Sequence, residues 1–352
     1  MRLTIPPVGG GPSLEKLDFP AFRSNMRLTE HNVADEVRNC DPPLVTVLVV
    51  TWNRREEVME TVRSINDQAY RNVEIVVVDN GSTDGTESAL QEAFPEVKLV
   101  ALDSNRGISS GRNAGIDVAM GEIVLCLDSD ASLAPDTLGN IVRRFEAEAD
   151  LGIINSKVVN AHSKVLDGGP GWVYTERQKA RQDEEFLSWS FSETGVAIRK
   201  EVFERAGTFL DLLFFGCEGL EFSLRTWDAG YKILYYPEAL VYHRVALRSR
   251  IAGKERDCLF LKNTLYTYIV RYPLWVMLPL GALKVGATLV RGARRRYLTD
   301  ILRVLIDVAS RLAMLLELRD PIRNQTARFH LRLQRQHGPL SWDLLSWLKY
   351  KT

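Results

Sequence analysis

Two aspartates separated by one residue are the residues best placed to do chemistry. Asp128 and Asp130 follow the apolar run 122–127 (EIVLCL), which is typical of a strand buried on both faces of a sheet. Alternate side chains of an extended backbone point to the same side, so the two carboxylates can face one cation. Carboxylate oxygens suit Mg²⁺ or Mn²⁺, and such an ion can neutralise the charge that grows on a departing diphosphate. By itself, however, Asp-Ser-Asp is more often only a turn after a strand.

A second polar cluster begins at Asp79. This residue comes directly after the β-branched run 73–78 (VEIVVV) and opens the segment DNGSTDGT. Its carboxylate can accept the N–H of a pyrimidine base, and the glycines allow the backbone to approach a ligand closely. A turn followed by a helix cap at Asp84 or Thr86 explains this segment alone equally well.

A sheet must position these clusters, because each follows an apolar run of strand length. The predicted strands are 44–50 (LVTVLVV), 73–78, 97–102 and 122–127. Helical spacing is found between them at 56–65 and 107–120. This alternation predicts an α/β fold with a mostly parallel, Rossmann-like nucleotide-binding sheet. Ligands bind beyond the carboxyl ends of such strands, where three polar clusters, 51–53, 79–81 and 128–130, converge on one crevice.

Several segments, in this order, carry a resemblance to a known family. They are VTVLVVTWNRREEVMETVRSI, VEIVVVDNGSTDGT, SNRGISSGRNAGI and GEIVLCLDSDASLAPDTL, followed by SETGVAIRKEVFERAGTF and CEGLEFSLRTWDAGYKILYYPEALVYH. Together they resemble glycosyltransferase family 2, in its rhamnosyltransferase-like branch, over about 45–243. The resemblance implies the GT-A fold. The expected organisation is an N-terminal extension (1–42), a catalytic domain (43–250, with a nucleotide-binding half 43–130 and an acceptor half 131–250) and a helical C-terminal region (251–352).

Carried over by position, the resemblance implies a nucleotide-sugar site and a metal site. The expected nucleotide-sugar contacts are Thr51, Trp52, Asp79, Asn105, Arg112, Asp128, Thr194 and Gly195. Thr51 and Trp52 would flank the base, Asp79 would bond it, and Arg112 would lie near the diphosphate. The expected ligands of Mn²⁺ or Mg²⁺ are Asp128, Asp130 and His243, and imidazole suits Mn²⁺. Without the resemblance, a single histidine after Tyr242 would more often be an ordinary packed or solvated side chain.

The catalytic base is the point at which this chain departs from its relatives. In inverting relatives an acidic pair occupies positions 218 and 219, and its second member serves as base, but here that residue is Gly219. Glycine cannot take a proton, so Glu218 or Glu221 is the predicted base that removes the acceptor hydroxyl proton. Either glutamate can instead cap or pair within the following helix. The segment 218–227 also resembles the polypeptide N-acetylgalactosaminyltransferases, which retain anomeric configuration.

The resulting prediction is an enzyme that transfers a hexosyl or deoxyhexosyl group from a UDP- or dTDP-linked sugar to a hydroxyl acceptor. The acceptor would be a glycan, lipid-linked or secondary-metabolite molecule, as in polysaccharide biosynthesis, and transfer would be metal-dependent and inverting. Retaining transfer, or a nucleotide-sugar-binding protein that has lost its base, stays open because of Gly219. A nucleotidyltransferase is disfavoured, since no glycine-rich loop with a basic residue follows the first strand.

Composition restricts location and partners. Lys plus Arg and Asp plus Glu both number 45, so no net charge draws the protein onto nucleic acid. The four cysteines are dispersed and the first residues lack a signal peptide's apolar run, which favours the cytoplasm. The apolar stretch 264–290 contains Arg271, Pro273, Pro279 and Lys284, so no transmembrane helix is predicted.

Two interpretations of the C-terminal region stay open. Aromatic and aliphatic residues at 266–290, followed by Arg291 and Arg294 to Arg296, could lie on an anionic membrane surface. A lipid-linked acceptor would favour this interpretation. The same pattern is expected of a helical subdomain packed on the catalytic core. Trp172, Trp189 and Trp227 could stack on a sugar, although core packing is the more frequent role of a tryptophan.

Overall fold

The computed structural model describes residues 41–167, 176–244 and 253–337. Most of the predicted N-terminal extension and Trp172 lie outside these residues. The strands are β1 (Val45–Thr51), β2 (Val73–Asp79), β3 (Lys98–Ala101), β4 (Ile123–Asp128), β5 (Ala131–Leu133), β6 (Leu151–Asn160), β7 (Phe186–Leu187), β8 (Gly195–Arg199) and β9 (Lys232–His243). The helices are α1 (Arg55–Asn66), α2 (Thr86–Ala93), α3 (Ile108–Ile116), α4 (Thr137–Glu146), α5 (Glu176–Ala180), α6 (Lys200–Ala206), α7 (Glu218–Asp228), α8 (Gly253–Arg271), α9 (Leu274–Arg295), α10 (Leu298–Ser310), α11 (Leu312–Glu317) and α12 (Asn324–His337).

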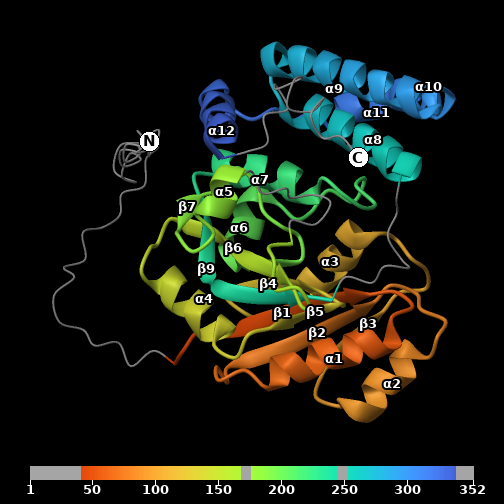
Figure 1. Ribbon diagram of the computed structural model, residues 1–352. Coiled ribbons are helices and arrows are strands. Elements are labelled where there is room, and N and C mark those ends of the chain that lie inside the picture. The colour runs from red at the N-terminus through yellow and green to blue at the C-terminus, as the bar shows by residue number, and fades with distance from the viewer. Residues whose placement is uncertain (1–40, 168–175, 245–252, 338–352) are drawn as a thin grey trace, which may run out of the picture. The chain divides into compact units, whose positions relative to one another are not determined.

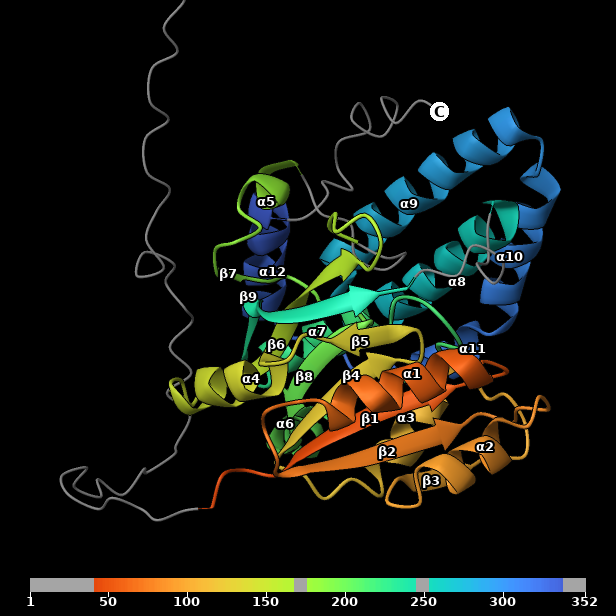
Figure 2. The same ribbon diagram turned by 60° about the horizontal axis from the view of Figure 1, so that its bottom comes forward.

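One mixed sheet forms the centre of the described residues, with the strand order β3-β2-β1-β4-β8-β6-β9-β5 (Figure 1). The first four of these strands are parallel, as the sequence predicts, whereas β8 runs antiparallel to both β4 and β6. All seven residues of β1 are buried, because α1 and α3 lie on opposite faces of the sheet there (Figures 1 and 2). The predicted α/β class is confirmed.

Helix α3 packs unusually close to β1 because its inner positions are glycines. A Cβ on Gly115 would stand only 2.1 Å from Cδ1 of Leu48, and one on Gly111 would stand 2.7 Å from Cγ1 of Val50. A side chain at either position would push the helix away from the sheet. Arg112, which lies between these two glycines, is therefore held against the carboxyl ends of the strands.

Strand β9 is longer than the sequence indicates. The pattern predicts a strand only before Pro237, yet β9 continues to His243. Proline has no N–H to donate to a ladder, and the pairing of β9 with β6 skips it: Ser156 pairs with Tyr236, and the next pair is Lys157 with Leu240. Because of this irregularity β9 continues past Pro237, and His243 at its end pairs with β5 at the edge of the sheet.

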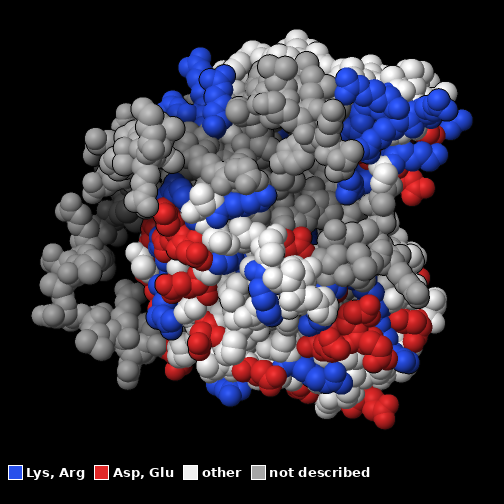
Figure 3. Space-filling model, in the orientation of Figure 1, with Lys and Arg blue, Asp and Glu red and all other residues white. Residues whose placement is uncertain are grey.

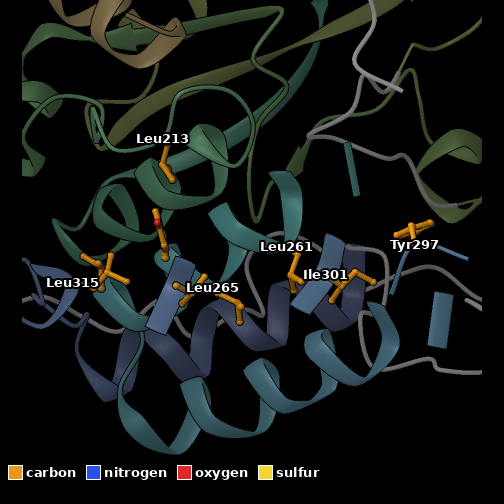
Figure 4. Packing of buried hydrophobic residues seen from close by; sticks show 9 residues of the cluster. Leu213, Leu261, Leu265, Tyr297, Ile301 and Leu315 are labelled. Carbon is orange, nitrogen blue, oxygen red and sulfur yellow. The ribbon is translucent and has the colours of Figure 1, made fainter. Parts of the chain in front are cut away.

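The C-terminal helices pack on the α/β part, and residues 41–352 form one unit. Leu213, from the loop before α7, joins a hydrophobic cluster with Leu261 and Leu265 of α8, Ile301 of α10 and Leu315 of α11 (Figure 4). A second cluster joins residues of α7, α8 and α9, among them Leu224, Tyr268, Val276 and Leu280. These clusters show that the described C-terminal helices pack on the α/β part, whereas the membrane interpretation concerns the other side of these helices.

Candidate active site

Strand pairing brings the three predicted metal ligands together. Ala131 of β5 pairs with His243 of β9, which sets the histidine beside Asp130. One ligand atom from each of Asp128, Asp130 and His243 lies within 4.8 Å of the others. Nε2 of His243 is 3.3 Å from Oδ1 of Asp130, and its Nδ1 is 2.8 Å from Oδ2 of Asp167. Asp167, which the sequence analysis missed, therefore sets the orientation of the imidazole ring.

The carboxylates at this position form a strong site for positive charge. Burial raises the pKa of Asp130, but hydrogen bonds from His243 and Arg54 outweigh burial and lower this pKa to about 2. Burial lowers the pKa of His243, but its hydrogen bonds with Asp130 and Asp167 outweigh this effect and raise it to about 10. Burial also raises the pKa of Asp128, against the attraction of Arg112 and with the help of the charge on Asp130.

These residues fit a divalent cation. Arg54, which the sequence analysis also missed, ion-pairs with Oδ2 of Asp130, so a cationic group already occupies this carboxylate. Two carboxylates and one imidazole are a donor set that suits Mn²⁺, and the carboxylates alone suit Mg²⁺. Asp128, Asp130 and His243 would hold the ion, with Arg54 as its competitor for Asp130.

The predicted base-binding residues lie at the carboxyl ends of neighbouring strands. Thr51 of β1 pairs with Asp79 of β2, while Val50 pairs with Asp128 of β4. The side chain of Asp79 is buried, and its Oδ1 accepts a 3.0 Å hydrogen bond from the N–H of Ser82. Oγ1 of Thr51 is buried with no hydrogen-bond partner among the described residues. Beside them Trp52 is half exposed, which leaves a flat apolar ring at the edge of the sheet.

A network of amide side chains holds the loop that contains Asn105. Asn80 donates to Oδ1 of Asn105 at 3.2 Å and to the carbonyl of Gly107 at 3.0 Å, and it accepts from the N–H of Arg106. Oδ1 of Asn105 also accepts from the N–H of Gly107. Asn105 thus shapes the loop beside Asp79, whereas its predicted contact with a nucleotide sugar stays a prediction.

Arg112 lies between Asp128 and Glu193. Its Nη2 is 3.5 Å from Oδ1 of Asp128 and donates a 2.8 Å hydrogen bond to the carbonyl of Glu193. Its Nη1 is buried and has no hydrogen-bond partner in the described part of the chain. Burial lowers the pKa of Arg112, but nearby acidic groups, including Asp128, Glu193 and Glu218, outweigh it. A buried, charged donor with an unused N–H is suited to an anionic ligand.

Thr194 and Gly195 lie directly beside Asp128. The carbonyl of Thr194 accepts a 3.1 Å hydrogen bond from the N–H of Asp128, and the hydroxyl of Thr194 bonds the Asp128 carboxylate and lowers its pKa. Gly195 pairs with Leu127 across β8 and β4, and a Cβ there would meet Val241 at 2.7 Å. These two residues therefore align the carboxylate of Asp128.

The two predicted bases have different surroundings. Glu221 is fully buried, and its two oxygens are bonded by Arg225 and Arg271 at 2.6 to 2.8 Å. Glu218 is also buried, and its Oε1 accepts a 2.7 Å hydrogen bond from the N–H of Gly216. Burial, together with the negative charge of neighbouring Glu193, raises the pKa of Glu218 well above its usual range. Glu193 was not singled out from the sequence, although it lies in the conspicuous SETG segment.

Of the three tryptophans considered for stacking on a sugar, the two that lie within the described residues, Trp189 and Trp227, are packed in the core. Trp189 is almost fully buried, and its carbonyl accepts a hydrogen bond from the ring of His330. Trp227 donates to the carbonyl of Ser188 and meets Phe329 edge to face. Their stacking on a sugar is therefore not favoured, and Trp52 is the exposed indole at the site.

Comparison with known proteins agrees with this geometry. Residues 46–207 match the family model described as Glycosyl transferase family 2. The match covers β1 to the end of α6, and so includes Asp79, Asp128 and Asp130 but not His243. The chain is 37% identical over 162 residues to the succinoglycan biosynthesis protein ExoO of Rhizobium meliloti (strain 1021), covering 45% of this chain and 44% of that protein.

Another similar protein is the putative teichuronic acid biosynthesis glycosyltransferase TuaG of Bacillus subtilis (strain 168). It is 38% identical over 99 residues, which are 27% of this chain and 39% of that protein. The chain spans about half the length of curated relatives such as ExoO. Family resemblance is therefore shown for the α/β part, and the activity of the whole protein is a proposal.

Two solved structures show the fold. GalNAc-T7 with UDP, GalNAc and Mn²⁺ has a TM-score of 0.58 at 17% identity, covering 78% of this chain and 58% of that chain. The mannosyltransferase PcManGT from Pyrobaculum calidifontis, in complex with GDP-Man and Mn²⁺, has a TM-score of 0.52 at 22% identity, covering 88% of this chain and 87% of that chain. The predicted GT-A fold with a helical C-terminal region is confirmed.

Proposed function

We propose that this protein transfers a sugar from a nucleoside-diphosphate sugar to a hydroxyl acceptor in a metal-dependent reaction. The observation that carries the proposal is the arrangement around Asp128. A three-residue donor set for a cation adjoins a buried arginine with an unused N–H, and both lie beside the ends of the parallel strands. A cation and an arginine within reach of one another are what a diphosphate leaving group requires.

The donor would bind through residues at three strand ends. Asp79 would accept the N–H of a uracil or thymine base with Oδ2, because Oδ1 is engaged by Ser82. Trp52 would cover the base with its exposed ring. Nη1 of Arg112 would donate to the diphosphate, and Asn105, Thr194 and Gly195 would line the path between base and sugar.

The metal would be Mn²⁺ or Mg²⁺, held by Asp128, Asp130 and His243. When bound, it supplies Lewis-acid stabilisation of the departing diphosphate. Asp167 holds the imidazole of His243 in position, and Arg112 adds a second positive charge 3.5 Å from Oδ1 of Asp128. The remaining requirement of an inverting transfer is a group that takes the proton of the acceptor hydroxyl.

The relatives support the class of donor and acceptor. The two solved structures contain UDP with Mn²⁺ and GDP-Man with Mn²⁺, and the two curated relatives are named for succinoglycan and teichuronic acid biosynthesis. We infer a hexosyl or deoxyhexosyl donor linked to UDP or dTDP, and an acceptor that belongs to a growing polysaccharide. GDP-linked donors belong in the same test because one structural neighbour carries one.

The direct test measures binding and turnover together. Calorimetry with UDP, dTDP and GDP, with and without Mn²⁺, should show one nucleotide that binds substantially only with the metal. The corresponding sugar nucleotides should release nucleoside diphosphate. Asp130→Asn should weaken Mn²⁺-dependent binding by more than about tenfold, because it removes a charged ligand.

Asp117→Asn is the matched control, since Asp117 is an exposed aspartate at the end of α3. It should bind and turn over as the unchanged protein does. A folded protein that binds none of the nucleotides, or an Asp130→Asn variant with unchanged affinity and turnover, would contradict the proposal. Binding without release from any donor would instead identify a nucleotide-sugar-binding protein.

We further propose that the C-terminal helices rest on an anionic membrane surface at its cytoplasmic side. Large apolar side chains are exposed on three consecutive helices: Leu274, Trp275, Leu278 and Val290 of α9, Leu298, Leu302 and Ile306 of α10, and Leu312 and Leu316 of α11. Those of α10 recur every four residues and so share one helix face. In Figure 3 the upper edge, where Figure 1 places α9, is mostly white, with lysine and arginine side chains gathered near α10.

Helix α9 could meet the membrane in two ways. Within the described residues it is the one helix long and apolar enough to cross a membrane by length and composition, and only 17% of its apolar window is buried. However, Val276 and Leu280 of α9 are buried in a cluster with α7 and α8, and a crossing helix would have to leave that cluster. We therefore favour a helix that lies in the interface, with Arg294 to Arg296 at its end on the lipid headgroups.

Vesicle sedimentation tests this placement. The protein should bind vesicles that contain phosphatidylglycerol more strongly than vesicles of phosphatidylcholine alone, and high salt should release it. Ile306→Gln should weaken binding, whereas Met120→Gln, at an equally exposed apolar residue of the α/β part, should not. Equal binding to both vesicles would contradict the proposal, and protein that only detergent extracts from cell membranes would indicate a crossing helix.

A further inference from the structure

The carboxylate of Glu193, a residue outside α7, binds the first turn of α7. Oε1 of Glu193 accepts a 2.8 Å hydrogen bond from the N–H of Gly219. The same oxygen lies 3.1 Å from the point where a Cβ on residue 219 would stand. Glu193 therefore occupies the space that an acidic side chain at position 219 would enter. The positive end of the helix dipole stabilises a negative charge there.

Only one of the two neighbouring carboxyl groups is accessible. Glu218 is 1% exposed, and its buried carboxyl group forms a side-chain hydrogen bond with Glu193. Burial and the charge of Glu193 raise the pKa of Glu218, and they outweigh the opposing attraction of Arg112. Both effects favour the protonated form of Glu218 over its carboxylate. Glu193, in contrast, is partly exposed, so its carboxylate is the one that a bound molecule can reach.

The backbone of Glu193 connects it to the proposed donor site. Its carbonyl accepts a hydrogen bond from Nη2 of Arg112, and the same nitrogen lies 3.5 Å from Oδ1 of Asp128. The next residue, Thr194, is hydrogen-bonded to Asp128 through its backbone carbonyl. One arginine and one peptide unit thus separate Glu193 from the residues that would hold the diphosphate. A sugar attached to that diphosphate would be bound between the diphosphate and Glu193.

We propose that Glu193 is the general base of the sugar transfer, a role that rests on the proposed function. The acceptor hydroxyl oxygen forms the bond to the anomeric carbon while its proton passes to the carboxylate of Glu193. The bond between the anomeric carbon and the diphosphate oxygen breaks, and its electron pair leaves on that oxygen. Protonated Glu193 then releases its proton to solvent. The sequence-based assignment of the base to Glu218 or Glu221 is thereby replaced by Glu193, and Glu218 becomes a buried neighbour of the base.

Two isosteric variants separate these assignments. Glu193→Gln keeps an oxygen that accepts from the N–H of Gly219, so α7 keeps its cap, but it removes the base. Glu218→Gln imitates the protonated state of Glu218. Release of nucleoside diphosphate is measured with UDP-, dTDP- and GDP-sugars and Mn²⁺, with water as acceptor. UDP affinity is measured by calorimetry, and Glu204→Gln, at an exposed glutamate of α6, is the control.

We expect Glu193→Gln to lower kcat by at least about 100-fold, since a general base contributes about 10² to 10⁴, with UDP affinity within about threefold of the parent. Glu218→Gln and Glu204→Gln should stay within about fivefold of the parent kcat. Sodium azide should restore release in Glu193→Ala, because azide attacks the anomeric carbon without losing a proton. A residue that only caps α7 would not respond to azide.

Each other outcome overturns one proposal or both. Turnover that survives in Glu193→Gln, or is lost only in Glu218→Gln, means that Glu193 is not the base while the proposed function stands. A Glu193→Gln variant that loses UDP affinity and turnover in parallel, without azide rescue of Glu193→Ala, means that Glu193 only supports the fold of the site. If the unchanged protein releases nucleoside diphosphate from no donor, the proposed function fails and this inference fails with it.

Discussion

Replacing Glu221 by Gln should destabilise the protein and leave its turnover intact. The carboxylate has no exposed surface, and it accepts hydrogen bonds from Nε and Nη2 of Arg225 at 2.8 and 2.6 Å and from Nε of Arg271 at 2.7 Å. Both arginines are themselves largely buried. Glu221 therefore ties α7 to α8, and no oxygen of its carboxylate is left to serve as a base.

The size of the effect follows from these contacts. Removing one partner of a buried ion pair costs about 3 to 5 kcal/mol, because the remaining charge is left without compensation. Gln keeps one oxygen as acceptor, so we expect a loss in the free energy of unfolding near the lower end, about 3 kcal/mol. With an unfolding entropy of about 2.1 cal/mol/K for each of the 352 residues, this loss lowers Tm by about 4 °C.

Thermal unfolding followed by circular dichroism, and nucleoside diphosphate release at 20 °C, measure the two quantities. Glu148→Gln is the matched control, because Glu148 also pairs with two cations, Arg144 at 2.8 Å and Lys232 at 2.6 Å, but keeps 28% of its side chain exposed. Each of these partly solvated pairs should contribute no more than about 1 kcal/mol. An unchanged Tm together with lost turnover in Glu221→Gln would refute the argument and make Glu221 a catalytic group.

Two further predictions concern a buried histidine and a tight turn. Burial lowers the pKa of His330 to about 4. Below pH 6.5 the imidazole is therefore protonated in the unfolded chain while it stays neutral in the folded protein. The contribution of neutral His330 to the free energy of unfolding is complete well above pH 6.5, and roughly 2 kcal/mol of it is lost by pH 5. Urea unfolding should therefore show a smaller change in stability between pH 7 and pH 5 in His330→Gln than in the parent protein. An equal change in both proteins would contradict this prediction. Gly81→Ala should cost more than about 1 kcal/mol and weaken nucleotide binding, because φ is +77° and the new Cβ would stand 2.6 Å from the backbone of Ser104. Gly230→Ala, with φ of +91° and nothing within 4 Å, is its control in the same unfolding assay, and equal costs would show that the contact with Ser104 does not matter.

Much of the α/β part follows from local patterns. The continuous apolar runs at 44–50, 73–78 and 122–127 correspond to β1, β2 and β4 with shifts of about one residue, because a strand buried on both faces cannot tolerate polar side chains on either face. The antiparallel position of β8 between β4 and β6 could not be predicted. Strand direction and order depend on contacts between segments far apart in the chain, and a single apolar run contains no information about its neighbours.

The residues of the candidate site also differ in whether their positions could be predicted from the sequence. Thr51, Asp79 and Asp128 could be placed together from the sequence, because parallel strands end at one edge and each residue closes a strand. His243 could be assigned to the metal group only through family resemblance. Its approach to Asp130 depends on the pairing of β5 with β9, which joins residues more than 100 positions apart.

The sequence by itself determined the kinds of groups at the site and the strands that carry the first of them, since strand length, apolar period and polar ends are local properties. The tertiary structure alone decided how each glutamate is used. It paired Glu221 with two arginines, removed Glu218 from solvent, and brought Glu193 to the N-terminus of α7 beside Gly219. Burial and charge partners control whether a carboxyl group can exchange a proton, and both arise only when distant segments pack together.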